Sequence, residues 1–179
     1  MKAALIVAVA CLSLTGCLGY HVGPVKPYYL RDVHTIAVPT FGNRTLVPRI
    51  EVLVTDTVIK QLQQDGTFQI ASDGNADATL KAQITHIDRS PARSANANVL
   101  LTTEFNLALH LRYTVVAQDG TTLAGPAEAV GTTSFFVSET GTSNANSQVG
   151  DVTTDERQAL PLATEDLATR LVSQLSEGW

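Results

Sequence analysis

The sequence predicts an α+β fold, a two-layer sandwich with two amphipathic helices packed on one face of a mixed, mostly antiparallel sheet of about four strands. Three observations lead to this fold. Two segments, residues 50–62 and 160–175, carry apolar side chains at helical spacing. A third segment, residues 104–115, alternates between polar and apolar side chains, which is typical of a strand with one buried face. Both helices need an apolar surface to pack on, and this strand face supplies it.

The chain begins with the pattern of an exported protein. Lys2 precedes an apolar run over residues 3–14. That run is shorter than the roughly 20 residues that cross a bilayer, but it is typical of a signal peptide. It leads into "LTGC", which is similar to the lipobox of bacterial lipoproteins. This resemblance implies that residues 1–16 are a lipoprotein signal peptide that is removed, and that Cys17 then carries a diacylglycerol and an N-acyl chain such as palmitate.

The residues around Cys17 bear on where the protein resides. Two or more acyl chains hold a protein stably on a membrane. Leu18 occupies the position at which Asp retains enteric lipoproteins in the inner membrane, so we expect a lipid-anchored protein of the outer membrane that faces the periplasm. Cys11 lies in the removed segment, and the mature chain is therefore expected to form no disulfide.

Length and charge indicate one acidic domain behind a short tether. Residues 17–33 contain two prolines and two glycines and are expected to form an extended, acylated tether. Tyr28 and Tyr29 are expected to pack on the domain, which spans residues 34–179. The chain has a net charge of −5 and no basic tract, so nucleic acid is not an expected partner.

The first half of the domain is expected to contain a strand, a helix and a second strand. Residues 35–39 form the strand, and Gly42-Asn43 makes a turn after it. A helix of about 17 residues follows, with Pro48 in its first turn and Gly66 at its end. Residues 68–72 form the next short strand. The buried stripe of the helix is expected to be Ile50, Leu53, Val54, Val58 and Leu62.

Antiparallel strands are expected in the second half. Residues 78–85 alternate in polarity, and residues 91–99 are predicted to be a polar loop. The clearest strand, residues 104–115, has its odd-numbered side chains on the apolar face. Asp119-Gly120 is a hairpin turn before a return strand over residues 121–137. The apolar face of the strand over residues 104–115 is expected to consist of Phe105, Leu107, Leu109, Leu111, Tyr113 and Val115.

The last part of the chain contains a break, a loop and the second helix. Gly125-Pro126 is expected to bulge or break the return strand, and residues 138–151 form a polar loop. Asp151 or Thr153 can cap the final helix, and Pro161 either kinks that helix or marks a late start. Its buried stripe is expected to be Leu160, Ala163, Leu167, Leu171 and Leu175.

No catalytic or metal-binding pattern is found in the sequence. The four histidines are widely spread and lack the spacing of metal ligands. Neither a phosphate-binding loop nor a nucleophile elbow occurs. We therefore expect a binding or assembly protein and not an enzyme, with no metal and no cofactor other than the covalent lipid on Cys17.

Several segments together resemble the LptE family of lipopolysaccharide-assembly lipoproteins. They are "GCLGYHVG", "TIAVPTFGNRTLVPRIEVLVTDTVIKQLQQDGTFQI", "ADATLKAQITHI" and the terminal "LATEDLATRLVSQLSEGW". The resemblance implies two helices on a mixed sheet. It also implies a protein that sits inside the LptD β-barrel of the outer membrane, plugs its lumen, helps it assemble, binds lipopolysaccharide and assists delivery to the cell surface.

Binding a phosphorylated glycolipid requires cationic donors, and four residues are candidates for this role. Lys81 and Arg112 are expected to share the polar face of the sheet, with Arg89 and Arg93 at its loop end. The alternative for each of the four is an ordinary solubilising surface charge.

A second function remains open from the sequence. Similar lipoproteins activate a cell-wall synthase in the periplasm or support a secretion channel. Such activators tend to have long tethers, whereas the tether here has at most about 16 residues and spans about 50 Å when extended. A short tether favours the barrel plug because it keeps the domain near the membrane.

Overall fold

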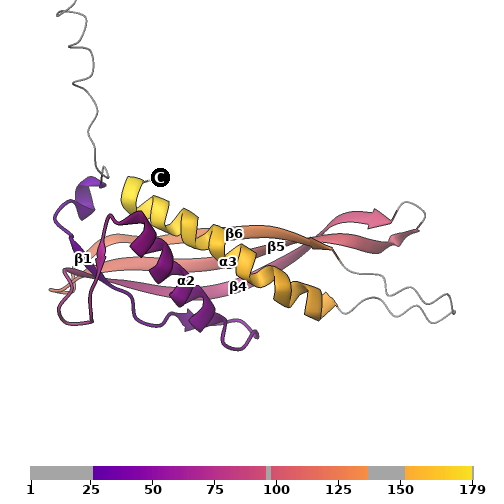
Figure 1. Cartoon of the computed structure of the whole chain (residues 1–179), viewed down its shortest axis with the longest axis horizontal. Helices are drawn as coiled ribbons and strands as arrows, with labels where there is room; N and C mark the ends of the chain where they lie inside the picture. Colours follow the sequence, from indigo (N-terminus) through magenta and orange to yellow (C-terminus); the bar gives the residue numbers. More distant parts are fainter. Residues whose placement is uncertain (1–25, 96–97, 137–151, 179) are drawn as a thin grey trace, which may run out of the picture.

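In the computed structural model, residues 26–95, 98–136 and 152–178 are described. They form one layer of strands and one layer of two helices, with both helices on the same side of the sheet (Figure 1). The expected α+β class is therefore confirmed. In chain order the elements are η1 (Tyr28–Leu30), β1 (Thr35–Ala37), β2 (Gly42–Asn43), α2 (Ile50–Asp65), β3 (Gln69–Ile70), β4 (Ala78–Ala95), β5 (Asn98–Ala117), β6 (Thr122–Phe136) and α3 (Val152–Glu177).

The sheet contains six strands within the described residues, whereas about four were expected. Their order is β3-β1-β4-β5-β6, and β2 pairs with β4 off this path. Strands β4, β5 and β6 are antiparallel, while β1 and β2 run parallel to β4. The unexpected strand is β2, because Gly42 and Asn43 pair with β4 instead of making the predicted turn.

Helix α2 has the predicted extent and buried side. It begins at Ile50, so Pro48 lies before the helix and not in its first turn. It ends at Asp65 and is capped by Gly66, which adopts φ 74° and donates its N–H to the Leu62 carbonyl at 3.0 Å. Glycine suits this left-handed position because it has no Cβ. The predicted stripe is buried except for Leu53, which is half-buried.

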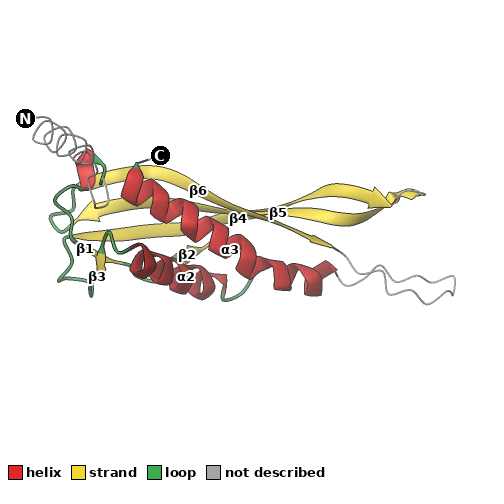
Figure 2. Ribbon diagram, turned by 45° about the horizontal axis from the view of Figure 1, so that its top comes forward, coloured by secondary structure: helices red, strands yellow, loops and turns green. Residues whose placement is uncertain are grey.

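Helix α3 runs from Val152 to Glu177 with Pro161 inside it, so the proline does not mark a late start. It lies along the strands and contacts β5, β6 and α2 (Figure 2). The Tyr113 hydroxyl of β5 donates to Oε1 of Gln174 at 2.9 Å, which fixes the C-terminal half of α3 on the sheet. All five side chains of its predicted stripe are buried.

The predicted facing of β5 is confirmed. Leu107, Leu109, Leu111 and Val115 have no exposed surface, and Tyr113 is buried with them. Phe105, nearer the far end of the strand, is half-buried and stacks on Phe135 of β6. The hairpin at Asp119-Gly120 is also present, with the Ala117 N–H donating to the Thr121 carbonyl at 2.8 Å.

Residues 91–95 and 98–99 belong to strands and not to the polar loop predicted over residues 91–99. Strand β4 continues to Ala95, and β5 begins at Asn98. This part of the hairpin extends past the end of the helix layer (Figure 2). A hairpin that no helix covers has no need for an apolar face, so its composition resembles that of a loop. The polar segment 138–151 and its capping residues lie outside the part of the chain whose side chains are described.

The start of the described chain joins the core through different residues from those predicted. Leu30 and Val33 are buried, whereas Tyr28 is 81% exposed and Tyr29 is 47% exposed, so the expected packing of Tyr28 and Tyr29 is wrong. None of the helices in the described ranges is long and apolar enough to cross a membrane.

Candidate functional site

The sheet surface opposite the helices, called the outer face here, gathers the polar side chains of the central strands. These side chains alternate with the buried ones, so they point away from the helix layer. Its members include Lys81, Gln83, His86, Asp88, Asn106, His110, Arg112, Thr114 and Glu128. This surface contains two of the four predicted lipopolysaccharide-binding residues and a cluster of histidines.

Lys81 and Arg112 lie on the same surface, as the alternation predicts. Together with Gln83, Thr114 and Pro126 they line a shallow hollow over β4 and β5. Both cations are exposed, and among the described residues neither takes part in an ion pair. Two unpaired cations beside one hollow can donate charge-assisted hydrogen bonds to a phosphate.

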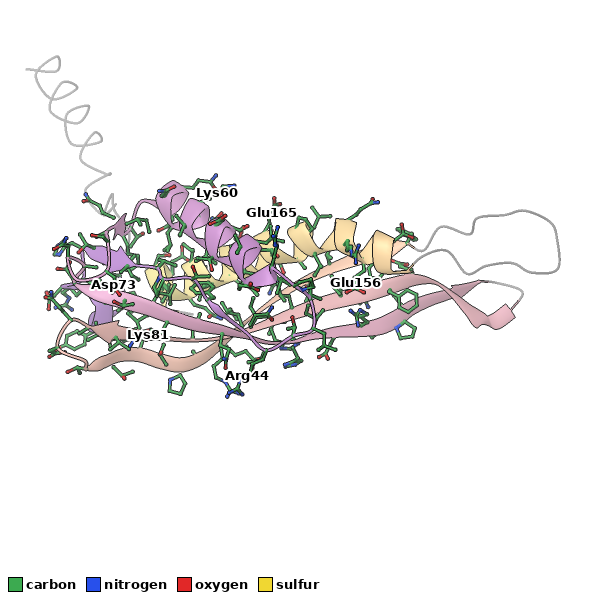
Figure 3. The ribbon with its side chains drawn as sticks, turned by 90° about the horizontal axis from the view of Figure 1, so that it is seen from below. Arg44, Lys60, Asp73, Lys81, Glu156 and Glu165 are labelled. Carbon is green, nitrogen blue, oxygen red and sulfur yellow. The ribbon has the colours of Figure 1, made fainter. Side chains whose placement is uncertain are left out.

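Arg44 adds a third cation that the sequence alone does not assign to this surface. It follows β2, and its N–H donates to the Ile84 carbonyl of β4 at 3.0 Å. Figure 3 shows its side chain pointing away from the helices. The pairing of β2 with β4 places Arg44 here, and that pairing is not visible in the sequence because the two strands are far apart along the chain.

Arg89 lies on the opposite side of the sheet from Lys81 and Arg112. Its guanidinium forms a two-bond ion pair with Glu156 of α3, in which Nη2 donates to Oε1 at 2.6 Å and Nε donates to Oε2. Glu156 is buried between α3 and the strands (Figure 3). The hydrogen bonds to the carboxylate raise the pKa of Arg89. The geometry therefore gives Arg89 a role in holding α3 on the sheet, and not the place at the loop end that the sequence suggests.

Replacing Arg89 by alanine is expected to destabilise the fold, because the Glu156 carboxylate would lose its partner in a nearly dry site. We expect a loss of about 2–3 kcal/mol, less than the roughly 3–5 kcal/mol of fully buried pairs, since the Arg89 side chain is 46% exposed. Urea unfolding monitored by circular dichroism measures this loss. Arg112→Ala removes the same charge from the outer face and should change the stability by less than about 0.5 kcal/mol; equal losses would contradict the assignment.

Arg93 and Cys17 complete the residues predicted from the sequence. The backbone of Arg93 pairs with Glu104 in the outer part of the hairpin, and the side chain of Arg93 lies outside the described part of the chain. Cys17 also lies outside it. The structure therefore leaves lipid attachment at Cys17 and ligand binding at Arg93 as predictions.

A cluster of His86, Asp88, His110 and Glu128 lies on the outer face across three strands. The two imidazole rings stack with centroids 3.9 Å apart and an interplanar angle of 16°. Asp88 Oδ2 is 3.4 Å from Nε2 of His86 and 3.3 Å from Nε2 of His110. On its other side, His110 Nδ1 is 2.8 Å from Oε1 of Glu128. Ligand atoms from His86, Asp88 and His110 all lie within 4.8 Å of one another, so these residues have the reach to hold a metal ion.

Although the four histidines are widely spread along the sequence, His86 and His110 are direct partners in the β4–β5 ladder. A bulge at Thr85 causes this, since the register shifts between Ile84 and His86. Without the bulge, simple alternation from Ile84 would place His86 on the helix side. The sequence predicts the two strands but not the bulge between Ile84 and His86. It therefore does not reveal that His86 and His110 lie side by side.

The comparisons with known proteins agree on the fold. A comparison with curated proteins finds no match. Among solved structures, one from Xanthomonas campestris is similar with a TM-score of 0.54 and 12% identity, covering 87% of this chain and 89% of that chain. A candidate lipoprotein from Caulobacter crescentus has a TM-score of 0.51 and 10% identity, covering 80% and 89% of the two chains. At such identities the likeness shows the fold alone.

A family model gives the assignment that these structures do not. The model named LptE and described as lipopolysaccharide-assembly matches residues 33–175. The matched segment contains every strand of the described sheet, all of α2, and α3 up to its last turn. Because the match covers most of the chain, the protein belongs to the LptE family.

Proposed function

We propose that the protein is a lipoprotein of the outer membrane, anchored through Cys17, that acts with an LptD-type β-barrel as plug and assembly factor in lipopolysaccharide transport. The observation that carries this proposal is the family match over residues 33–175. The lipobox-like "LTGC" supports the anchor, and Leu18 after Cys17 supports the outer-membrane location.

The distribution of polar side chains is compatible with a plug. The interior of a large outer-membrane barrel is polar and wet, so a protein inside it needs a polar exterior and a rigid core. The outer face supplies the polar surface. The core is continuous from β1 through both helices to β6, and among described side chains no buried polar atom lacks a hydrogen-bond partner.

The outer face also supplies the place where a phosphorylated glycolipid fits best. The net charge of the chain is −5, which argues against attraction of lipopolysaccharide by the whole surface. Arg44, Lys81 and Arg112 nevertheless gather on one side of the sheet. We assign the phosphate contacts of lipopolysaccharide to these three cations, with Arg89 excluded because Glu156 occupies its guanidinium.

Copurification tests the barrel partnership. The chain is isolated from detergent-solubilised outer membrane after a photo-crosslinking residue has been placed at Thr114 on the outer face, and separately at the exposed Gln63 of α2. We expect a large β-barrel protein in a one-to-one ratio, crosslinked from Thr114. Recovery of a cell-wall synthase or a secretion channel, with no barrel, would favour the periplasmic alternative.

Removing two outer-face cations is expected to weaken lipopolysaccharide binding. The Lys81→Ala/Arg112→Ala variant should bind at least about tenfold more weakly, because each charge-assisted hydrogen bond contributes about 1.5 kcal/mol or more. Surface plasmon resonance with immobilised lipopolysaccharide measures this. The matched control, Lys60→Ala/Arg157→Ala, removes the same charge from exposed positions on the two helices. A similar loss in both variants would mean that net charge and not the outer face governs binding.

A further inference from the structure

We propose that His86, His110 and Asp88 form a binding site for a divalent transition-metal ion of the zinc type on the outer face. The proposal is independent of the barrel partnership, because it rests on the geometry of these side chains and of the two groups that orient their rings. It assigns a site on strands β4 and β5, supported by Glu128 from β6.

The first argument concerns the ring protons of His110. Its Nδ1 is 2.8 Å from Oε1 of Glu128, and an ionised carboxylate can only accept a hydrogen bond. The proton of the neutral ring therefore resides on Nδ1. This leaves Nε2 with a lone pair, and Nε2 is the atom that faces Asp88 at 3.3 Å.

The contacts of His86 are compatible with the same tautomer. The Thr85 hydroxyl can donate its single hydrogen to the His110 carbonyl, which is 3.3 Å away. Its oxygen, 3.0 Å from Nδ1 of His86, then accepts from an Nδ1–H donor. In this tautomer Nε2 of His86 also carries a lone pair, and it too faces Asp88, at 3.4 Å.

In these tautomers three electron-rich atoms converge, and all three could hold one cation. The two Nε2–Oδ2 distances, 3.4 and 3.3 Å, are longer than the usual N–H···O bond of about 2.9 Å. They match the separation of two ligands on one tetrahedral zinc ion, because ligands about 2.0–2.1 Å from the metal lie roughly 3.3–3.4 Å apart. The alternative is a neutral His86 ring that carries its proton on Nε2 and donates it to Asp88, and zinc titration distinguishes the two.

The donor set selects the kind of metal. Two imidazole nitrogens favour zinc, copper, nickel or cobalt over magnesium and calcium, which prefer oxygen ligands. The Glu128–His110 contact has the form of a carboxylate that orients a metal-binding histidine. The stacked rings must splay at their Nε2 edges to close on one ion, and the His86 side chain, 51% exposed, has room to do so. Solvent supplies the remaining ligand, since the Asp88 side chain is 65% exposed.

Isothermal titration calorimetry tests the proposal with the full-length chain, purified in detergent without a histidine tag and stripped with a chelator. We expect one zinc ion per chain and no binding of magnesium. His86→Gln and His110→Gln should each abolish binding over the titrated range. Glu128→Gln should weaken it by about 10–100-fold, as for other outer-shell partners. Cobalt(II) should give the visible absorption of a tetrahedral site, and this absorption should be lost in Asp88→Asn.

His34→Gln is the matched control, because it removes an exposed histidine that lies directly before β1, outside the cluster. It should bind zinc as the unaltered chain does. If His110→Gln fails to fold, His86→Gln and Asp88→Asn decide the matter, since both side chains are largely exposed. The proposal is overturned if the unaltered chain binds no zinc, if binding survives in His86→Gln, or if His34→Gln weakens it equally.

Discussion

Gly131→Ala is expected to push helix α3 off strand β6 and to destabilise the protein by about 3 kcal/mol, the upper end of the usual cost of overpacking. A Cβ at this position would overlap the Ala163 carbonyl oxygen and would lie 2.5 Å from both the backbone nitrogen and the Cβ of Leu167. These are atoms that no change of side-chain rotamer can move. Relief therefore requires the whole helix to shift away from the sheet.

Thermal unfolding of Gly131→Ala measures the effect. A loss of this size corresponds to a fall in Tm of roughly 6–12 °C for a domain of this length. Gly42→Ala is the matched control, since its new Cβ would meet the side chain of Gln83, with the nearest atom, Nε2, at 3.1 Å. A flexible, half-exposed glutamine can turn aside, so we expect a change below about 1 kcal/mol. Equal melting temperatures for Gly131→Ala and the unaltered protein would show that α3 does not approach β6 so closely.

Leu109→Asp is expected to prevent folding. Leu109 has no exposed surface and pairs with Ile87 of β4 and Gly131 of β6 in the centre of the sheet. Losing the apolar side chain costs about 2–5 kcal/mol, and an unpaired carboxylate in that position adds several kcal/mol more. The sum is comparable with the whole stability of a typical domain, about 5–15 kcal/mol. Far-UV circular dichroism and proteolysis of the purified chain detect the loss of structure.

Asn106→Asp controls for the added charge. Asn106 lies on the same strand but on the outer face, where its side chain is exposed. Its partners in the ladder, Ser90 and Ser134, are neutral, so the new carboxylate faces no charged side chain on either neighbouring strand. We expect this variant to fold and melt like the unaltered protein. A folded Leu109→Asp variant, or an unfolded Asn106→Asp variant, would mean that the facing of β5 is the reverse of that described.

The sequence by itself determined the elements whose side chains face the core. The period-2 alternation of β5 and the helical stripes of α2 and α3 are predictable because burying apolar surface imposes a regular pattern on each element separately. The glycine at the end of α2 and the Asp119-Gly120 hairpin were predictable for a similar reason, since each requires a local backbone conformation. The membership of Lys81 and Arg112 in one polar surface followed from the same alternation.

Only the tertiary structure decided what depends on one segment meeting another. The outer half of the β4–β5 hairpin extends past the helices, so its polar sequence indicates a loop although its backbone pairs as strands. The bulge at Thr85 reverses the facing of β4 beyond it, which carries Arg89 to Glu156 and His86 to His110. The bulge lets Ile87 face the core while β4 stays paired with β5. Its stability therefore depends on contacts that both strands make. The structural role of Arg89 and the histidine cluster therefore depend on contacts between strands and helices that no single segment encodes.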